Sequence, residues 1–227
     1  MPKHIIQNVE FKIEMFLLLK INYRCNIICI YINQGEMKMF KELVLNNRSY
    51  RRFYENEKID YSTLVDLIDC ARNTAASVNF QVLKYKLVND ETNNKKVFDC
   101  LAWAGLLKEW NGPEEGERPS AYVVVLCDKT ISTAKPIDVG IAAQTVLLAA
   151  TEKGYGGCMF GSIRRDKLAE ELNIDLERYS IELVIALGKP KETVKLVDVG
   201  ENGSTAYYRD ENGVHYVPKR SVDEIIL

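Results

Sequence analysis

AYVVVLCD, residues 121–128, is a continuous apolar run of the length of a single β-strand. Strands buried on both faces read as unbroken hydrophobic runs, whereas half-exposed strands alternate. A second run of this kind, IELVIALG, spans residues 181–188. The two segments therefore predict two buried core strands.

A long helix is predicted between these two strands. It begins at Pro136 and ends at Gly154, because proline is favoured in the first turn of a helix and glycine directly after the last. Apolar side chains lie nearly all round it, namely Ile137, Ile141, Ala142, Val146, Leu147 and Ala150. Such a helix is buried on more than one side. A single small domain can hardly cover it, so we expect it to contribute to the interface of a homodimer.

The other elements follow from shorter patterns. Residues 60–73 predict a helix capped by Asp60, with one apolar face made by Leu64, Leu67, Ile68 and Ala71. VLKYKLV, residues 82–88, alternates as a half-buried strand does. Further helices are predicted at 39–46, 93–108 and 164–172, a loop at 109–120, a short strand or turn at 156–162, and an extended tail from residue 189 onward. Helices interleaved with a few core strands indicate an α+β or α/β layered domain, whose strand order the sequence leaves open.

Composition narrows the classes of partner. The chain has 227 residues, enough for one full domain with a sizeable core, and a formal net charge of −2. Nucleic acids and anionic membranes usually need a broad basic surface, so neither is expected as a partner. The six cysteines are scattered, and no second close pair completes a zinc set with Cys25 and Cys29. Cys70, Cys100 and Cys127 fall in apolar stretches and are expected to be buried, which fits a reducing, cytoplasmic location.

The first part of the chain differs from the rest. Residues 15–32 are apolar but are interrupted by Lys20, Asn22, Arg24 and Asn26. A spanning helix needs about 20 residues with few or no charges, and a signal peptide places its charges before the apolar run. Our hypothesis is that residues 1–36 lie outside the domain and derive from translation upstream of the native start. The alternative is an extra helix or strand packed on the domain.

Basic residues are concentrated in NNRSYRRF, residues 46–53. Guanidinium groups match phosphate oxygens in a bidentate manner, and a serine hydroxyl donates alongside them. Arg48, Ser49 and Arg51 are therefore candidates to bind one anion, with a solvated charged turn as the alternative. Lys219 and Arg220 form a second, weaker basic pair near the end of the chain.

Two further segments have the composition of ligand-binding loops. NTAASVNFQ, residues 73–81, offers the amides of Asn79 and Gln81, although for this segment taken alone an ordinary connection between helix and strand is the favoured explanation. GYGGCMFGS, residues 154–162, is glycine-rich, and glycine permits close backbone approach. A helix end followed by a tight strand explains Gly154 but not Gly156, Gly157 and Gly161.

Several catalytic motifs are absent from the sequence. It contains no GxGxxG after a strand, no GxxxxGK[ST] and no HExxH. Its two histidines are His4 and His215, and a lone histidine in a tail is more often a surface residue than a catalyst. No metal site is predicted. Chemistry carried by a bound cofactor would explain the lack of a catalytic set.

In this order, the four segments resemble those of the FMN-dependent nitroreductase family. NRSYRRF is similar to the family's R-x-S-x-[R/K]-x-F flavin signature, and AASVNFQ to its P-S-x-x-N-x-Q-P segment. GCMFGS stands where the family has its strand beside the flavin ring, and VPKR where it has a Lys/Arg pair on the phosphate. The resemblance covers about residues 39–227, and we assign 37–227 to a nitroreductase-like FMN-binding domain. Asn47, Ala75 and Val82 depart from the pattern, replacing an arginine and two prolines.

The resemblance implies an α+β fold with three α-β-α layers around a mixed, mainly antiparallel sheet. It also implies a homodimer with two FMN sites at the interface and an extended C-terminal arm exchanged between subunits. By position, the phosphate would be held by Arg48, Ser49, Lys219 and Arg220, with Tyr50 in the same segment. Asn79, with Gln81 beside it, would face the ring or ribityl chain, and Arg51 the N1–C2=O edge. Backbone groups of Phe160, Gly161 and Ser162 would lie near N5, while Arg52 would be structural.

The implied activity is hydride transfer from NADH or NADPH through flavin N5 to a small electron-poor acceptor, such as a nitroaromatic or a quinone. The mechanism would be ping-pong, and no side chain is assigned as a covalent or acid–base catalyst. Two alternatives stay open: a flavoprotein that stores or delivers FMN, or another flavin reaction such as reductive dehalogenation or flavin destruction. Trp103 and Trp110 would either form a lid that selects the acceptor or pack in the core or interface.

Overall fold

A computed structural model describes residues 40–107 and 110–227 of the chain. The hypotheses on residues 1–36, and the start of the helix predicted at 39–46, lie outside the described residues.

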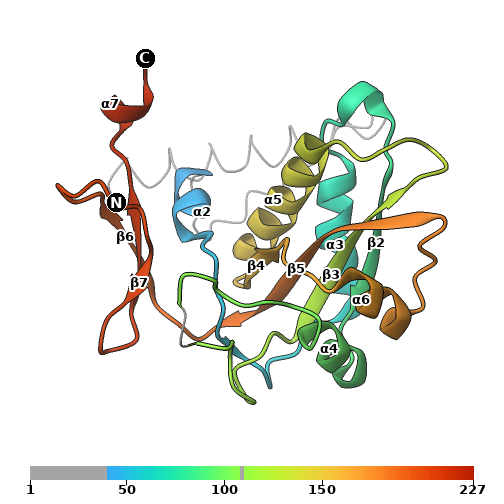
Figure 1. The fold of residues 1–227 in the computed structure, drawn as a ribbon, viewed down its shortest axis with the longest axis horizontal. Helices are drawn as coiled ribbons and strands as arrows, with labels where there is room; N and C mark the ends of the chain where they lie inside the picture. Colours follow the sequence, from blue (N-terminus) through green and yellow to red (C-terminus); the bar gives the residue numbers. More distant parts are fainter. Residues whose placement is uncertain (1–39, 108–109) are drawn as a thin grey trace, which may run out of the picture. The chain divides into compact units, whose positions relative to one another are not determined.

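The two apolar runs pair with each other at the centre of a five-stranded sheet (Figure 1). The strands are β1 (Phe53–Tyr54), β2 (Leu83–Val88), β3 (Ala121–Asp128), β4 (Gly156–Phe160) and β5 (Tyr179–Pro190). Their order is β1-β5-β3-β2, and β4 also pairs with β5. The pairs between these strands are antiparallel, with Val124 of β3 opposite Val184 of β5. The long strand β5 is thus the common partner of three others.

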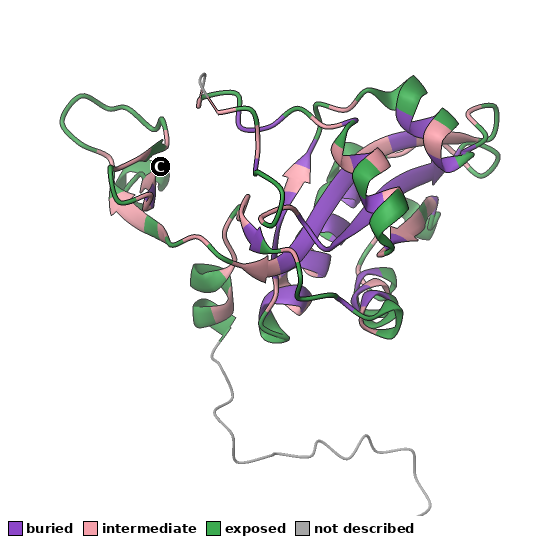
Figure 2. Cartoon of the chain, turned by 90° about the horizontal axis from the view of Figure 1, so that it is seen from below, coloured by how far each residue is buried: buried purple, intermediate pink, exposed green. Residues whose placement is uncertain are grey.

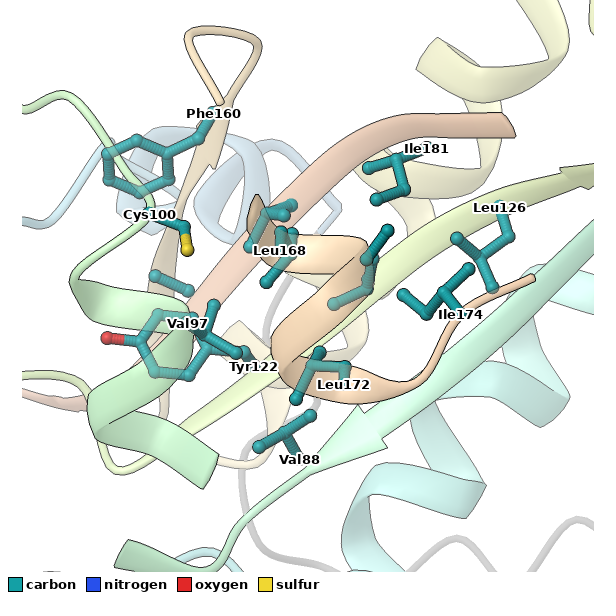
Figure 3. Close-up of a cluster of buried hydrophobic side chains, with 14 of the residues drawn as sticks. Val88, Val97, Cys100, Tyr122, Leu126, Phe160, Leu168, Leu172, Ile174 and Ile181 are labelled. Atoms are coloured by element: carbon teal, nitrogen blue, oxygen red, sulfur yellow. The ribbon is translucent and has the colours of Figure 1, made fainter. Parts of the chain in front are cut away.

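Helices cover both faces of this sheet. Val123 and Val125 of β3 pack in one cluster with residues of α3 (Tyr61–Arg72) and α5 (Pro136–Glu152). Val124 and Leu126 alternate with them and pack in a second cluster with α4 (Glu91–Phe98) and α6 (Arg165–Leu172), part of which Figure 3 shows. Side chains of a strand alternate between faces, so an unbroken apolar run supplies both clusters. The α+β fold with α-β-α layers is therefore confirmed.

The tail forms a small sheet of its own, the arm, defined here as residues 194–227. It contains β6 (Val194–Asp198), β7 (Tyr208–Arg209), β8 (His215–Lys219) and the short helix α7 (Val222–Ile225). Strand β8 pairs parallel with β6 and antiparallel with β7. Ser221 and Glu224 form a reciprocal capping box at the start of α7. Figure 2 shows that the arm is mainly exposed or half-buried, in contrast to the buried central strands.

The end of one helix and the burial of one cysteine differ from the predictions. Helix α4 ends at Phe98, whereas the sequence predicted helix to residue 108. The chain leaves the helix because Cys100 and Trp103 enter the core, where the Trp103 ring lies 4.6 Å from that of Phe160. Cys70 is exposed, contrary to the prediction, because α3 turns Leu64, Leu67 and Ala71 inward and Cys70 outward.

Helix α5 lies in the predicted range but is only partly covered. Ala143, Val146 and Ala150 are fully buried, whereas Ile137 is 65% exposed. Ile141 is also exposed, so the outer side of α5 carries two exposed isoleucines and is not buried within the single chain. Within residues 40–107 and 110–227, no helix combines the length and the apolar character needed to cross a bilayer.

Candidate functional site

The arginine motif runs as an extended segment from α2 (Phe40–Asn46) to β1, alongside strand β4. Ser49 forms a parallel bridge with Gly157, and the Tyr50 amide donates to the Gly157 carbonyl at 3.0 Å. A Cβ on Gly157 would lie 2.3 Å from the Ala186 carbonyl oxygen, and one on Gly156 would lie 2.4 Å from the Tyr50 ring. These two glycines are needed because larger residues would push the motif and β5 off this strand.

The motif opens into a cavity of about 360 Å³ that we call the basic cavity. Four of the predicted phosphate and flavin residues line it: Arg48, Ser49, Arg51 and Lys219. Helices α2 and α5 and strands β4 and β8 supply its apolar wall, made by Val44, Leu147, Met159 and Val217. Asn47, Gln144, Tyr207 and His215 complete the lining. One basic motif and one residue from the other end of the chain therefore meet at a single hollow.

The charge of the basic cavity is not balanced by its own lining. Its lining includes three cations and no carboxylate, and none of these cations forms an ion pair among the described residues. Arg48 Nε is buried without a hydrogen-bond partner, while Arg48 Nη2 donates to the Val44 carbonyl at 2.5 Å. Burial lowers the pKa of Arg48, because desolvation disfavours its charged form. A half-buried guanidinium without a counter-charge is stabilised by an anionic ligand.

Glu192 holds the motif in place from outside the cavity. Its side chain is 1% exposed and accepts hydrogen bonds from the backbone amides of Arg51 and Arg52. Its other oxygen pairs with Arg209 of the arm at 2.8 Å. Glu192 is thus fully engaged by the backbone and the arm, and it forms no ion pair with the Arg51 side chain, which lines the cavity.

Two rings of the arm, inclined to each other by 42°, lie beside Arg51. The Arg51 guanidinium lies 5.0 Å from the Tyr207 ring centroid, and the Tyr207 ring lies 5.1 Å from that of His215. His215 is 1% exposed, not on the surface as predicted, and its Nδ1 has no partner among the described residues. Burial lowers the pKa of His215, so the imidazole is neutral near pH 7. The Arg51 guanidinium therefore contacts the face of the Tyr207 ring, and it has no carboxylate partner among the described residues.

Several predicted site residues lie away from the basic cavity. Arg220 is paired with Glu224 of α7 at 3.4 Å, although it directly follows Lys219. Tyr50 turns its ring onto Gly156, and its hydroxyl donates to the Asn46 carbonyl at 3.1 Å. Phe160 is buried in the core, whereas Gly161 and Ser162 are exposed at the end of β4. The single chain therefore assembles only part of the predicted site.

Asn79 and Gln81 belong to a different part of the structure. Gln81 lines a cavity of about 330 Å³ beside α3 and α5, and Asn79 is exposed in the turn η1 (Ser77–Asn79). Val78, Asn79 and Gln81 adopt φ values of 53°, 54° and 51°. Residues other than glycine rarely occupy this left-handed region, and a β-branched valine there is strained. Backbone strain in an exposed polar segment is typical of a functional loop.

The two tryptophans lie apart from the basic cavity. Trp103 is 8% exposed and packs among Phe98 and Phe160 in the core, so the core alternative holds for it. Trp110 is half-buried beneath Arg209, whose guanidinium lies 4.4 Å from its ring centroid. Trp110 therefore connects the loop before β3 to the arm.

Arg52 points away from the cavity and pairs with Glu117, as a structural arginine would. The pair lowers the pKa of Glu117 from 4.5 to about 2, chiefly through the hydrogen bond from Arg52, and Lys191 also contacts Glu117 at 2.9 Å. A depressed carboxyl pKa contributes stability above its unfolded value, and this stability is lost as pH falls from 4.5 toward 2.

We expect Glu117→Gln to lower the free energy of unfolding by about 1–3 kcal/mol near neutral pH, because Arg52 and Lys191 lose their counter-charge and one of the two acceptor oxygens. The difference from the wild type should shrink as pH falls through the range in which Glu117 is protonated. Urea unfolding of both proteins at a series of pH values measures this. A difference that does not change with pH would contradict the assignment.

The side chains described above do not form a metal site. Among residues 40–107 and 110–227, no group of three or more histidine, cysteine, aspartate or glutamate side chains is placed to hold an ion.

The antiparallel sheet between two helical layers defines an α+β protein, and a basic cavity lies where the arginine motif meets the arm. The model of the nitroreductase family matches residues 44–189, and the chain belongs to that family. No protein with a curated description matches it.

Solved structures with the same fold are similar to the chain at low identity. A protein from Desulfovibrio desulfuricans in complex with FMN is 18% identical, with a TM-score of 0.60, over 85% of this chain and 97% of that one. An FMN-dependent nitroreductase from Clostridium difficile R20291 is 21% identical, with a TM-score of 0.54, over 66% and 87%. An enone reductase of gut-bacterial fatty acid saturation, CLA-ER, is 20% identical, with a TM-score of 0.55, over 68% and 90%.

Proposed function

We propose that this protein is an FMN-dependent oxidoreductase that transfers hydride from NADH or NADPH to a small electron-poor acceptor, such as a nitroaromatic or a quinone. The observation that carries the proposal is the basic cavity, whose cations form no ion pair with any residue that the structure describes. Family membership and the FMN named for two of the similar structures support the choice of cofactor. Bound FMN would supply the hydride chemistry, accepting from the nicotinamide and passing on to the acceptor in alternating half-reactions.

The residues of the basic cavity fit the phosphate end of FMN. Arg48 and Lys219 would neutralise the phosphate, and the Ser49 hydroxyl would donate to one of its oxygens. Arg51 would hold the flavin edge, because its guanidinium is positioned by the Tyr207 ring and by its own hydrogen bond to the Ser49 carbonyl at 3.2 Å. The proposed hydride transfer does not require any side chain of this protein to donate or accept a proton.

A homodimer would complete the site. In the single chain, Asn79 and Gln81 lie outside the basic cavity, in a strained and exposed segment. Apolar side chains are exposed on α2, on α5 and at the C-terminus, including Phe40, Leu45, Ile137 and Ile225. Association of two copies through these surfaces would cover them and would bring the Asn79 segment of one copy toward the basic cavity of the other. The arm is the part of the chain best suited to reach across such an interface.

The free, buried thiols of Cys100, Cys127 and Cys158 suit a reducing compartment, and we propose a cytoplasmic location.

The first test is the cofactor and the turnover of the purified full-length protein. We expect a yellow protein whose released flavin is FMN, and NADH or NADPH oxidation that depends on added menadione or nitrofurazone. Protein that neither contains flavin nor binds added FMN would overturn the proposal. Bound FMN without turnover on any acceptor would instead favour a protein that stores or delivers FMN. Product analysis with halogenated substrates would separate reductive dehalogenation.

Arg51→Ala is expected to lower the flavin reduction potential as well as to weaken binding. A cation at the flavin edge stabilises the negative charge of the reduced ring, so its removal disfavours reduction. We expect a shift of about 30 mV to lower potential, equivalent to roughly 1.4 kcal/mol for a two-electron couple. A potentiometric titration against a reference dye measures it, and the exposed Arg72→Ala serves as a control. An unchanged potential in a variant that retains FMN would place Arg51 away from the ring.

A further inference from the structure

In the described part of the chain, seven of the eight buried side-chain polar atoms without partners fall into two groups, and the eighth is Trp103 Nε1 in the core. One group comprises Arg48 Nε, Arg209 Nε and His215 Nδ1, at the basic cavity and the Glu192 pair beside it. The other comprises Asn94 Oδ1, Arg118 Nε, Ser120 Oγ and Tyr122 OH. Buried polar groups are nearly always hydrogen-bonded, so a cluster of unpaired ones indicates that something else binds there. Unpaired buried polar atoms support the basic cavity as a binding site, and the second group of such atoms therefore indicates a second binding site.

Three residues of the second group, Asn94, Arg118 and Tyr122, line a separate cavity of about 540 Å³, which we call the α4 cavity. It lies between α4, the turn after β1 and the loop that precedes β3, and it shares no lining residue with the basic cavity. Tyr122 is fully buried in the cluster on the α4 face of the sheet. Figure 3 shows its hydroxyl oxygen at the edge of that cluster, beside α4. The two cavities thus lie on opposite faces of the sheet.

Donors of the α4 cavity are fixed by their own contacts. The Arg118 guanidinium lies 4.4 Å from the centroid of the Phe98 ring, and its backbone amide donates to Glu55 Oε2 at 3.2 Å. Glu55 also accepts from the Gly116 amide at 2.5 Å. Its carboxylate is therefore engaged by backbone, and the Arg118 side chain has no ion pair within the described residues. Arg118 and Tyr122 together offer two positioned donors to an anionic group.

Acceptors stand beside these donors. Asn94 is 8% exposed and uses its amide nitrogen on the Ser120 carbonyl at 2.8 Å, which leaves its oxygen without a donor. Asp99 also lines the cavity, and its carboxylate has no ion-pair partner among the described residues. The charges of Asp99, Glu55 and Arg118 all act on the Tyr122 hydroxyl, while burial is the main cause that raises the pKa of Tyr122. The lining of the α4 cavity therefore contains both positively and negatively charged side chains.

We propose that the α4 cavity binds a small zwitterion of the α-amino-acid class, whose carboxylate is held by Arg118 and Tyr122 and whose ammonium is held by Asn94 and Asp99. A simple anion would leave the Asn94 oxygen unpaired, and a simple cation would leave both donors unpaired. Each buried group left without a partner is costly, so a ligand that satisfies Asn94, Arg118 and Tyr122 together is selected over one that satisfies only some of them. This site does not depend on flavin binding.

Calorimetric titration of the purified full-length protein tests the proposal, with glycine, L-alanine, L-serine, L-glutamate and L-lysine as probes. Ethylamine and propionate, each lacking one charged group of alanine, are the matched controls. We expect at least one amino acid to bind at millimolar concentration or below, and both controls to bind far more weakly. Failure of every amino acid to bind, or equal binding of the two controls, would overturn the proposal.

Two variants locate the binding. Tyr122→Phe removes a hydroxyl that has no partner, so it should fold normally and weaken the affinity about fivefold to tenfold. Arg118→Gln should weaken it roughly ten- to hundredfold, because a charged donor is lost. Tyr85→Phe, in β2 beside the cavity that contains Gln81, should have no effect. Wild-type affinity in Tyr122→Phe, or a crystal structure grown with the amino acid that shows only water at Tyr122 and Asn94, would refute the site.

Discussion

The double variant Arg48→Ala with Lys219→Ala is expected to purify without FMN. Both cations line the basic cavity, and neither has a carboxylate partner among the described residues that its loss would disturb. Charged hydrogen bonds contribute about 1.5–3 kcal/mol each, so removal of two should raise the Kd for FMN about a thousandfold. Quenching of flavin fluorescence in a titration of apoprotein with FMN measures the change.

A control must separate loss of the site from loss of charge. Arg72→Ala with Lys153→Ala removes the same net charge from exposed ion pairs on α3 and just after α5. Exposed pairs contribute little to stability, so this variant should bind FMN like the wild type. Thermal unfolding of both variants checks that the fold is intact. Retention of FMN by the first variant would mean that the phosphate is bound elsewhere and that the motif is a charged turn.

The central strands and the long helix could be predicted because burial alone dictates their sequence. Val123 and Val124 of β3 face different helical layers, and this requires an unbroken apolar run. Helix α4 could not be bounded in the same way. The residues after Phe98 suit a helix, but the chain leaves it to bury Trp103 against Phe160, a contact with a distant strand. Tertiary packing, and not local helix propensity, therefore determines where α4 ends.

The parts of the candidate site that lie within one short sequence motif could be predicted, whereas contacts between residues far apart in the sequence could not. Arg48 and Arg51 lie in one short motif, yet Tyr50 between them turns to the opposite side. Ser49 and Arg51 share one side of the extended segment, as alternation requires, but Arg48 has the parity of Tyr50 and still lines the cavity. Neither alternation nor the resemblance therefore separated Arg48 from Tyr50. Glu192 contacts the Arg51 amide across 141 positions, and an isolated glutamate in a charged stretch gives no signal of such a contact. His215 was expected on the surface because a lone histidine in a tail usually lies there, but it is buried against Tyr207, a contact that arises only in the folded arm.

Replacement of this glutamate, Glu192→Gln, is expected to be the most destabilising change at the site. The carboxylate is 1% exposed and serves two backbone amides and Arg209, whose side chain is 16% exposed. A glutamine amide can accept from part of this set, but it leaves Arg209 without its counter-charge. Breaking a buried ion pair from one side costs about 3–5 kcal/mol, and the partial exposure of Arg209 puts the expected loss near the lower figure, about 3 kcal/mol. Urea unfolding measures the loss.

The same variant links stability to cofactor binding. Glu192 holds the backbone from which Arg51 projects and also holds the arm that carries Lys219, so FMN affinity should fall together with stability. Glu171→Gln, which breaks the half-exposed pair with Lys96, should cost less than about 1 kcal/mol and leave FMN binding unchanged. Glu192→Gln combined with Arg209→Met should be more stable than the sum of the single changes predicts, because the second substitution removes the unpaired cation. Additive losses would show that Glu192 acts through the two backbone amides alone, and that the arm is held to the motif by other contacts.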